Sequence, residues 1–354
     1  MAKQAVLLLA HGTPETVEQI PEYLRNVVSG RPLPQAVVEE IQHRYALIGR
    51  SPLTEITFAQ ARLVEAELAG AGEAAPVYVG MRNWRPYISE VVRQMRADGI
   101  EEAAVICMAP HNSRTSVGLY RRAVEAEAGG LRIDFTEGWA RHPLLAEAFA
   151  ERLRPAVAKL GAEVGKPVPV LFTAHSVPTR TVEARPAEGQ PGVVPRPSDK
   201  DKSVARAGHP DPDPGDKEKK VARAEQPVWP GHGVDPYAEE ARLTAQLVAE
   251  RVPEIPQWWF AFQSQGVSGG PWLGPSVEQT LEQIAGEGVR ALILQPIGFL
   301  CDHVEILYDV DRLFRKCADK LKMRLERPES LNASGTLAKA VADLAGQGLR
   351  RLKG

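Results

Sequence analysis

Short runs of apolar residues recur along the chain, each long enough to form one buried β-strand. These predicted strands are residues 5–10, 77–80, 103–109, 168–173, 258–262 and 291–296. Between them apolar residues recur with helical spacing, and the predicted helices are residues 58–68, 86–97, 144–160, 238–252, 277–284 and 335–352. Strands that alternate with helices of this length form βαβ units with parallel strands. The sequence therefore predicts an α/β fold.

The pattern of strands and helices runs through the 354-residue chain twice. We predict two similar domains, residues 1–160 and 161–354, each with a parallel sheet flanked by helices, and a cleft between them. For the final helix, residues 335–352, packing against the first domain is an alternative. One segment interrupts the pattern, because residues 183–233 are rich in proline and charge and contain few residues to bury. Such a composition predicts a flexible insertion.

The composition is that of an ordinary globular protein, with 44% hydrophobic and 25% charged residues. The net charge of −2 gives no reason to expect nucleic acid as a partner. Residues 5–10 are too short for the core of a signal peptide, and no apolar run approaches the roughly 20 residues that span a bilayer. The three cysteines, Cys107, Cys301 and Cys317, form no CxxC pair, which suits a reducing compartment. We therefore predict a cytoplasmic protein.

Polar side chains follow several of the predicted strands. His11 comes directly after residues 5–10, and His175 comes two residues after residues 168–173. Ligands of open parallel sheets bind outside the carboxyl ends of the strands, so both histidines are candidates for such a position. An imidazole there can act as a base near neutral pH. For each histidine the alternative is a structural role, such as a hydrogen bond within a turn.

The most informative segment is residues 295–311, which begins at a strand end and continues into a predicted helix. Glu305 and Asp309 are four residues apart, so both carboxylates lie on one face of that helix. Their neighbours are apolar, and carboxylates in such surroundings bind a cation or transfer protons. No phosphate-binding glycine loop, HExxH motif or paired CxxC motif is present. The prediction is a cleft with a histidine on one side and a pair of carboxylates on the other.

Several segments, in order along the chain, resemble the ferrochelatase family. They are LLLAHGTPE at 7–15, HRYALIGRSPL at 43–53, APHNSRTSVGLY at 109–120, FTAHSVP at 172–178, DPY at 235–237, FQSQG with PWLGP at 262–275, and QPIGFLCDHVEILYD at 295–309. The FTAHSVP segment and the GFxxDHxExLYD pattern are the most specific, and the resemblance covers most of the chain. The segment at 183–233 lies outside it.

This resemblance implies two Rossmann-like domains that hold a porphyrin in the cleft between them. It implies that His175 and Glu305 are the catalytic residues, on opposite sides of the ring, and that these two residues and Asp309 bind the metal. Contacts with the porphyrin are implied for the following residues: His11, Arg44, Tyr45, Ser51 and Tyr120.

The activity implied by the resemblance is a lyase reaction of haem biosynthesis, the insertion of Fe²⁺ into protoporphyrin IX or coproporphyrin III with release of two protons. Arg44, with Arg25, Arg31 or Arg50 near it, is expected to pair with the propionates, which leaves both porphyrins open. Iron is a substrate, and no cofactor is implied. The cysteines that hold an iron–sulfur cluster in some members are not matched, so no cluster is expected.

The expected partners are therefore the porphyrin and ferrous iron, bound by a monomer. A transient contact with a haem-pathway protein or with a membrane surface is left open. Two alternative functions also remain at this stage. One is a related chelatase that inserts cobalt or nickel into a less oxidised tetrapyrrole. The other is a non-catalytic porphyrin-binding protein, which the presence of both His175 and Glu305 disfavours because a binder needs no proton acceptor on each side.

Overall fold

The computed structural model describes residues 2–182, 235–265 and 271–354. The residues up to Val182 and from Asp235 onward belong to one compact unit. The predicted flexible insertion at 183–233 lies outside the described residues. The predicted boundary between two domains at residues 160 and 161 stays a prediction.

The first sheet contains four parallel strands in the order β2-β1-β3-β4. They are β1 (Gln4–Ala10), β2 (Val77–Met81), β3 (Glu102–Cys107) and β4 (Arg132–Thr136). Every residue of β3 is buried, and so is all of β1 after its first residue, as expected of central strands covered on both faces. The connecting helices are α3 (Leu53–Gly70), α4 (Ile88–Ala97) and α5 (Val117–Ala128). The prediction of parallel α/β architecture is confirmed for this half of the chain.

The second sheet repeats that arrangement, with four parallel strands in the order β6-β5-β7-β8. They are β5 (Val170–His175), β6 (Trp258–Gln263), β7 (Ala291–Pro296) and β8 (Arg324–Glu326). The helices of this half are α6 (Pro143–Val164), the short α7 (Thr179–Val182), α8 (Tyr237–Glu250), α9 (Val277–Gly286), a π-helix (Glu305–Phe314) and α10 (Arg315–Lys320). The predicted fold class, two similar halves with parallel sheets flanked by helices, is confirmed.

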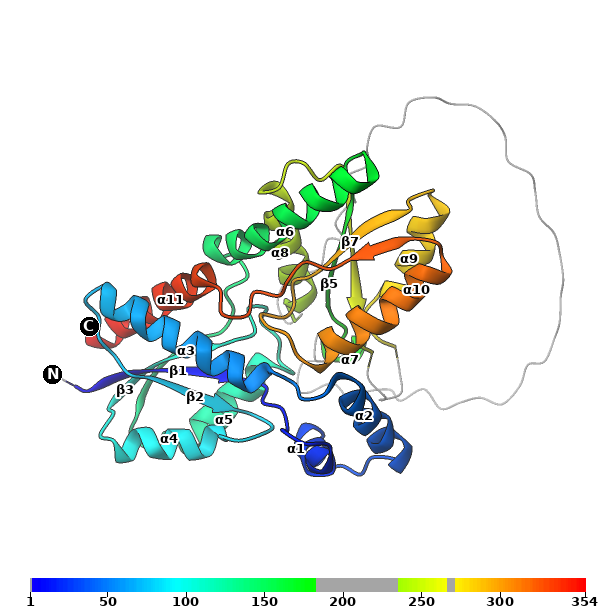
Figure 1. The fold of residues 1–354 in the computed structure, drawn as a ribbon. Helices are drawn as coiled ribbons and strands as arrows, with labels where there is room; N and C mark the ends of the chain where they lie inside the picture. The colour runs from blue at the N-terminus through cyan, green and yellow to red at the C-terminus, as the bar shows by residue number, and fades with distance from the viewer. Residues whose placement is uncertain (1, 183–234, 266–270) are drawn as a thin grey trace, which may run out of the picture. The chain divides into compact units, whose positions relative to one another are not determined.

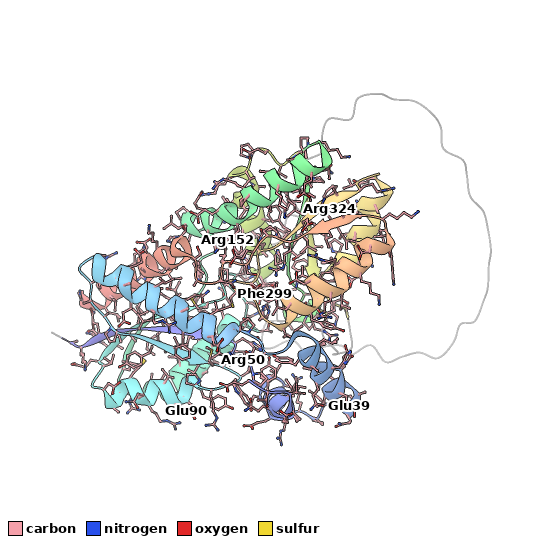
Figure 2. All side chains as sticks on the ribbon, in the orientation of Figure 1. Glu39, Arg50, Glu90, Arg152, Phe299 and Arg324 are labelled. Carbon is pink, nitrogen blue, oxygen red and sulfur yellow. The ribbon has the colours of Figure 1, made fainter. Side chains whose placement is uncertain are left out.

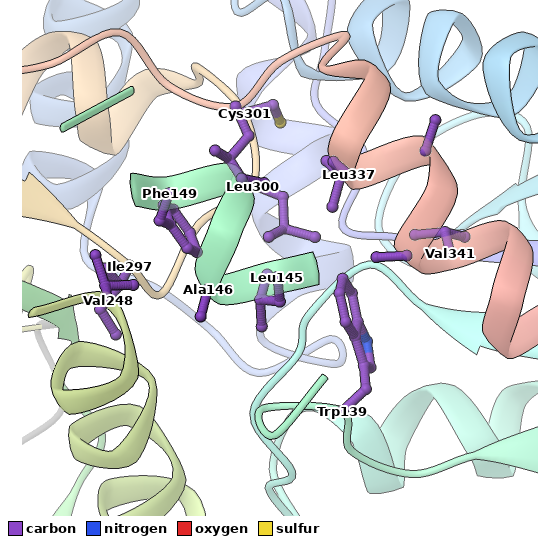
Figure 3. Close-up of a cluster of buried hydrophobic side chains, with 14 of the residues drawn as sticks. Trp139, Leu145, Ala146, Phe149, Val248, Ile297, Leu300, Cys301, Leu337 and Val341 are labelled. Atoms are coloured by element: carbon purple, nitrogen blue, oxygen red, sulfur yellow. The ribbon is translucent and has the colours of Figure 1, made fainter. Parts of the chain in front are cut away.

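One of the hydrophobic core clusters spans both halves. Figure 3 shows Leu145 and Phe149 of α6 packed close to Leu300, which belongs to the loop after β7, and near Leu337 of the last helix. That last helix, α11 (Gly335–Lys353), packs against α3 and β3 of the first sheet and against α6 (Figure 1). The second half of the chain therefore supplies a covering helix for the first sheet.

A small group of helices lies between β1 and α3. They are a 3-10 turn (Val17–Gln19), α1 (Ile20–Val27) and α2 (Gln35–Ile48). Their apolar side chains and Trp84, from the segment after β2, form a separate cluster, which we call the lip cluster: Ile20, Tyr23, Leu24, Tyr45 and Trp84. Val304, just before the π-helix, packs against the lip cluster. This contact brings the lip helices of the first half onto the segment that carries Glu305.

Within the described ranges, none of the helices combines the length and apolar character needed to cross a lipid bilayer.

Candidate active site

Two of the predicted site residues lie at the carboxyl ends of strands, one in each sheet. His11 directly follows β1, and His175 is the last residue of β5. Because β1 and β5 occupy the same place in the two strand orders, the two histidines hold corresponding positions. The carboxyl ends of parallel strands are where open α/β sheets bind their ligands.

His175 and Glu305 form a hydrogen-bonded pair. His175 Nδ1 lies 3.0 Å from Glu305 Oε2, and the two side chains are 34% and 32% exposed. Burial alone lowers the pKa of His175, but the neighbouring Glu305 carboxylate outweighs it and raises the pKa above its usual value. Burial likewise raises the pKa of Glu305, and the imidazole opposes this and brings it down to about 2. The ionised carboxylate of Glu305 therefore favours the protonated form of the imidazole beside it.

His175 and Glu305 were predicted to lie on opposite sides of the ring, and the structure places them in direct contact. Both belong to the second half, since His175 ends β5 and Glu305 begins the π-helix that follows β7. β7 lies next to β5, so the chain that leaves β7 returns over the end of β5 and places the acid directly on the imidazole. The contact spans 130 residues of sequence, and only the order of the strands determines it.

His11 is the predicted site histidine of the first half. Its pKa is lowered by burial to about 4, and Glu305, His303 and His175 are near enough to influence it. The His11 imidazole is therefore neutral at pH 7. Its Nε2 is hydrogen-bonded to the Tyr23 hydroxyl at 2.8 Å.

Asp309 lies one turn beyond Glu305 on the π-helix. Its carboxylate accepts hydrogen bonds from the Ser264 hydroxyl and from Arg44, whose Nη1 lies 3.3 Å away. Burial and the neighbouring Glu305 raise the pKa of Asp309 to about 6. Arg44, predicted to bind a propionate, also donates from Nε to Glu40 at 2.9 Å and stands 4.8 Å from the centre of the Tyr308 ring. Arg44, which lies on the lip helix α2, thus connects this helix to the π-helix.

Three predicted porphyrin contacts are buried residues. Tyr45 belongs to the lip cluster, and Ser51 lies between α2 and α3. Neither hydroxyl has a hydrogen-bond partner within the parts of the chain that the structure describes. A buried polar group without a partner destabilises the folded state until something binds it, so both are suitable for a ligand. Tyr120 lies on α5 and is also buried, and the porphyrin contacts of all three stay predictions.

Three further residues contact the two histidines and were not among the predicted site residues. Asn83 directs its side-chain amide at His11, with Nδ2 3.1 Å from Nε2. The Tyr237 hydroxyl donates to the backbone oxygen of His175 at 2.8 Å. Phe299, labelled in Figure 2, presents its ring to His175 on one side and to His303 on the other, with ring centres 6.1 and 4.4 Å apart. The DPY motif contained a signal for Tyr237, whereas Asn83 stands outside the quoted motifs.

Arg327 anchors both ends of the segment that carries the acids. Its guanidinium donates two hydrogen bonds to Asp311, at 2.7 and 2.8 Å, and a third to Asp302 at 3.3 Å. Asp302 also accepts hydrogen bonds from Ser330 and Asn332. Asp302 precedes Glu305 and Asp311 follows Asp309, so this network holds the first turns of the π-helix in place.

We expect Arg327→Met to lower the free energy of unfolding by about 3 kcal/mol, because the substitution leaves two partly buried carboxylates without their cation. The midpoint of urea unfolding, followed by circular dichroism, measures the effect. Arg315→Met is the matched control, since Arg315 is exposed and makes no ion pair with the described residues. It should change the free energy by less than about 0.5 kcal/mol. Equal midpoints for the two variants would show that the network does not stabilise the fold.

Within the described ranges, no group of three or more histidine, cysteine or acidic side chains is arranged to hold a metal ion. The metal-binding roles of His175, Glu305 and Asp309 stay predictions.

The fold of this chain resembles that of a chelatase of known structure. A solved structure of the sirohydrochlorin chelatase SirB from Bacillus subtilis subspecies spizizenii, in complex with cobalt, matches 99% of this chain and 97% of its own length with a TM-score of 0.52. The sequence identity of 9% limits this likeness to the fold. The two parallel sheets are therefore those of the chelatase fold.

Comparison of sequences identifies the family as well as the fold. The family model Ferrochelatase matches residues 3–349. A protein named Ferrochelatase from Acidobacterium capsulatum is 54% identical over 99% of this chain and 96% of its own length. A Coproporphyrin III ferrochelatase from Mycolicibacterium vanbaalenii is 31% identical over 97% of this chain and 89% of its own. The chain belongs to the ferrochelatase family, and the resemblance seen in its motifs is confirmed.

Proposed function

We propose that this protein inserts ferrous iron into a porphyrin and that the His175–Glu305 pair receives the protons that the metal displaces. The first part rests on family membership, because the activity of this family is a lyase reaction that inserts iron into porphyrin in haem synthesis. The observation that carries the second part is the hydrogen bond between His175 and Glu305 at the carboxyl end of β5.

The reaction requires a proton acceptor beside the ring. A free porphyrin carries two pyrrole N–H protons, and both leave when Fe²⁺ takes their place. Nδ1 of His175 is engaged by Glu305, and Nε2 has no partner among the described residues, so Nε2 is the atom that takes a pyrrole proton. The carboxylate of Glu305 then stabilises the imidazolium that forms. The same stabilisation by Glu305 raises the pKa of His175.

Glu305 and Asp309 supply the oxygen atoms of the site. Carboxylate oxygens suit Fe²⁺ as it loses water, and they also provide a route by which protons leave. Asp309, with a pKa of about 6, gains and loses a proton close to neutral pH. His11, neutral and hydrogen-bonded to Tyr23, lies on the side of the first sheet. Binding of the porphyrin by His11, Arg44, Tyr45, Ser51 and Tyr120 is part of the same proposal.

Two porphyrins remain as substrates, protoporphyrin IX with two propionates and coproporphyrin III with four. The relative from Mycolicibacterium vanbaalenii is named for coproporphyrin III, and the relative from Acidobacterium capsulatum carries the general name. We also propose a cytoplasmic monomer that needs no resident cofactor or iron–sulfur cluster and binds no nucleic acid. A transient contact with a haem-pathway protein or a membrane surface is compatible with this proposal.

Anaerobic incubation with Fe²⁺ and each porphyrin in turn tests the activity. The expected result is loss of the free-base absorption bands and growth of the metalloporphyrin spectrum with at least one of the two porphyrins. A parallel series with Co²⁺ and Ni²⁺, on a porphyrin and on a reduced tetrapyrrole, separates this activity from that of a related chelatase. Iron insertion no faster than in the absence of protein would refute the proposal.

A further inference from the structure

Arg82 follows β2 at the carboxyl edge of the first sheet and is partly buried. Its backbone is held in place, since its N–H donates to Ala10 O at 2.9 Å. Its guanidinium, in contrast, forms no ion pair or hydrogen bond with any residue that the structure describes. Burial lowers the pKa of Arg82, and the nearby Arg122 on α5 lowers it further. Arg122 is exposed and likewise has no acidic partner in the described parts of the chain.

Two arginines close to Arg82 or Arg122 in the sequence are paired with acids. Arg85, three residues further along, is 3.9 Å from Glu90, and Arg121 lies 2.7 Å from Glu137. A partly buried cation beside a second cation is unfavourable unless an anion joins them. Arg82 therefore differs from these two arginines in having no acid beside it. Binding of an anion offsets the energetic cost of burying the guanidinium without a partner.

The surroundings of Arg82 place it beside the proposed site. The guanidinium lies 5.9 Å from the centre of the Tyr120 ring, and it is close enough to His11 to lower the pKa of that imidazole. Tyr23, the hydrogen-bond partner of His11, is also within its electrostatic influence. Arg44 belongs to different surroundings, because it contacts Asp309 and Tyr308 of the π-helix. Arg82 and Arg44 are thus two separate cationic positions around one site.

We propose that Arg82, supported by Arg122, binds a propionate carboxylate of the porphyrin on the side of the first sheet. This inference rests on the proposed function, which makes a porphyrin the ligand. The propionates are the anionic groups of such a ligand, and the planar guanidinium matches a carboxylate with two parallel hydrogen bonds. Arg82 is then a specificity-determining residue, because it favours tetrapyrroles that carry a carboxylate at this edge of the ring.

Equilibrium binding without metal tests the proposal, so the readout does not depend on iron insertion. The probes are coproporphyrin III, protoporphyrin IX and protoporphyrin IX dimethyl ester, each titrated by fluorescence under one buffer and detergent condition. Arg82→Met should weaken binding of at least one of the two free acids by about 10- to 100-fold, the usual worth of a charge-assisted hydrogen bond. The free acid that loses affinity identifies the substrate that places a propionate at Arg82. Binding of the dimethyl ester should change less than about threefold, since it has no carboxylate to lose.

Arg85→Met is the matched control, because Arg85 lies on the same loop and is 67% exposed. Its Kd values should equal those of the unmodified protein within about twofold. Arg82→Lys, which keeps the charge but not the planar fork, should recover part of the lost affinity. Far-ultraviolet circular dichroism confirms that each variant is folded.

Unchanged binding of both free acids by Arg82→Met would overturn the inference. An equal loss for the free acids and the dimethyl ester would also overturn it, because Arg82 would then act through packing. These results are independent of the iron assay. Normal iron insertion with an unaffected Kd refutes the role of Arg82 alone, whereas normal porphyrin binding without iron insertion refutes the proposed function.

Discussion

Replacement of His175 by alanine should lower the rate of iron insertion by about 10²- to 10⁴-fold, the usual contribution of a positioned proton acceptor. The substitution removes the nitrogen atom that takes the pyrrole proton and leaves Glu305 without its partner. Both side chains are about one third exposed, at 34% and 32%, so water can solvate the freed carboxylate and the protein should stay folded. Initial rates of metalloporphyrin formation under anaerobic conditions measure the loss.

The affinity for porphyrin distinguishes a catalytic role of His175 from a structural one. If His175 accepts protons, kcat falls while the Kd for free porphyrin changes by only a few fold. His43→Ala is a suitable control, since His43 is exposed on α2 and should leave the rate within about twofold. A rate close to normal in the folded His175→Ala variant would exclude His175 as the acceptor.

The second large effect is expected from Glu305→Gln, which keeps the shape of the side chain and removes its charge. The rate should again fall by about 10²-fold or more, because the imidazolium formed at His175 loses its counter-ion. The pH profile should change as well. In the unmodified protein His175 must be neutral to accept a proton, so activity rises with pH through a pKa that Glu305 holds above its usual value.

Without that carboxylate, burial dominates and the pKa of His175 falls. The acid limb of the Glu305→Gln profile should therefore move to lower pH, although the maximal rate is smaller. Measurement of kcat between about pH 5 and 9 gives both quantities. Glu282→Gln, a change of an exposed residue on α9, should leave rate and profile as they are. An acid limb that stays in place in Glu305→Gln would contradict the assignment of that limb to His175.

Most of the fold could be predicted from the periodicity of apolar residues. The central strands β1, β3, β5 and β7 are almost wholly buried, so their sequences are continuous apolar runs. The two edge strands that were missed lack this signal. All five residues of β4 are at least partly exposed, and β8 has only three residues. Edge strands are covered less completely, and their composition approaches that of a loop.

The candidate site was predictable in its residues but not in its geometry. The motifs located His11, His175, Glu305 and Asp309 correctly at or beyond the ends of strands. Which of them touch depends on the order of strands in a sheet, and no local pattern encodes that order. For the same reason the sequence did not indicate that Arg44 pairs with Asp309, a contact across 265 residues. Nor could it show that Arg82 has no acid beside it, because that requires every neighbour to be known.

The strand order 2-1-3-4 of the first sheet recurs as 6-5-7-8 in the second. This repeat explains which parts of the site are alike in the two halves and which differ. Because β1 and β5 hold the same place in the two orders, the histidine after β1 corresponds to the histidine that ends β5. The scaffold alone thus places an imidazole at the same strand end of each half. What makes the two faces chemically unequal is the rest of each half, a carboxylate on one and an uncompensated guanidinium on the other.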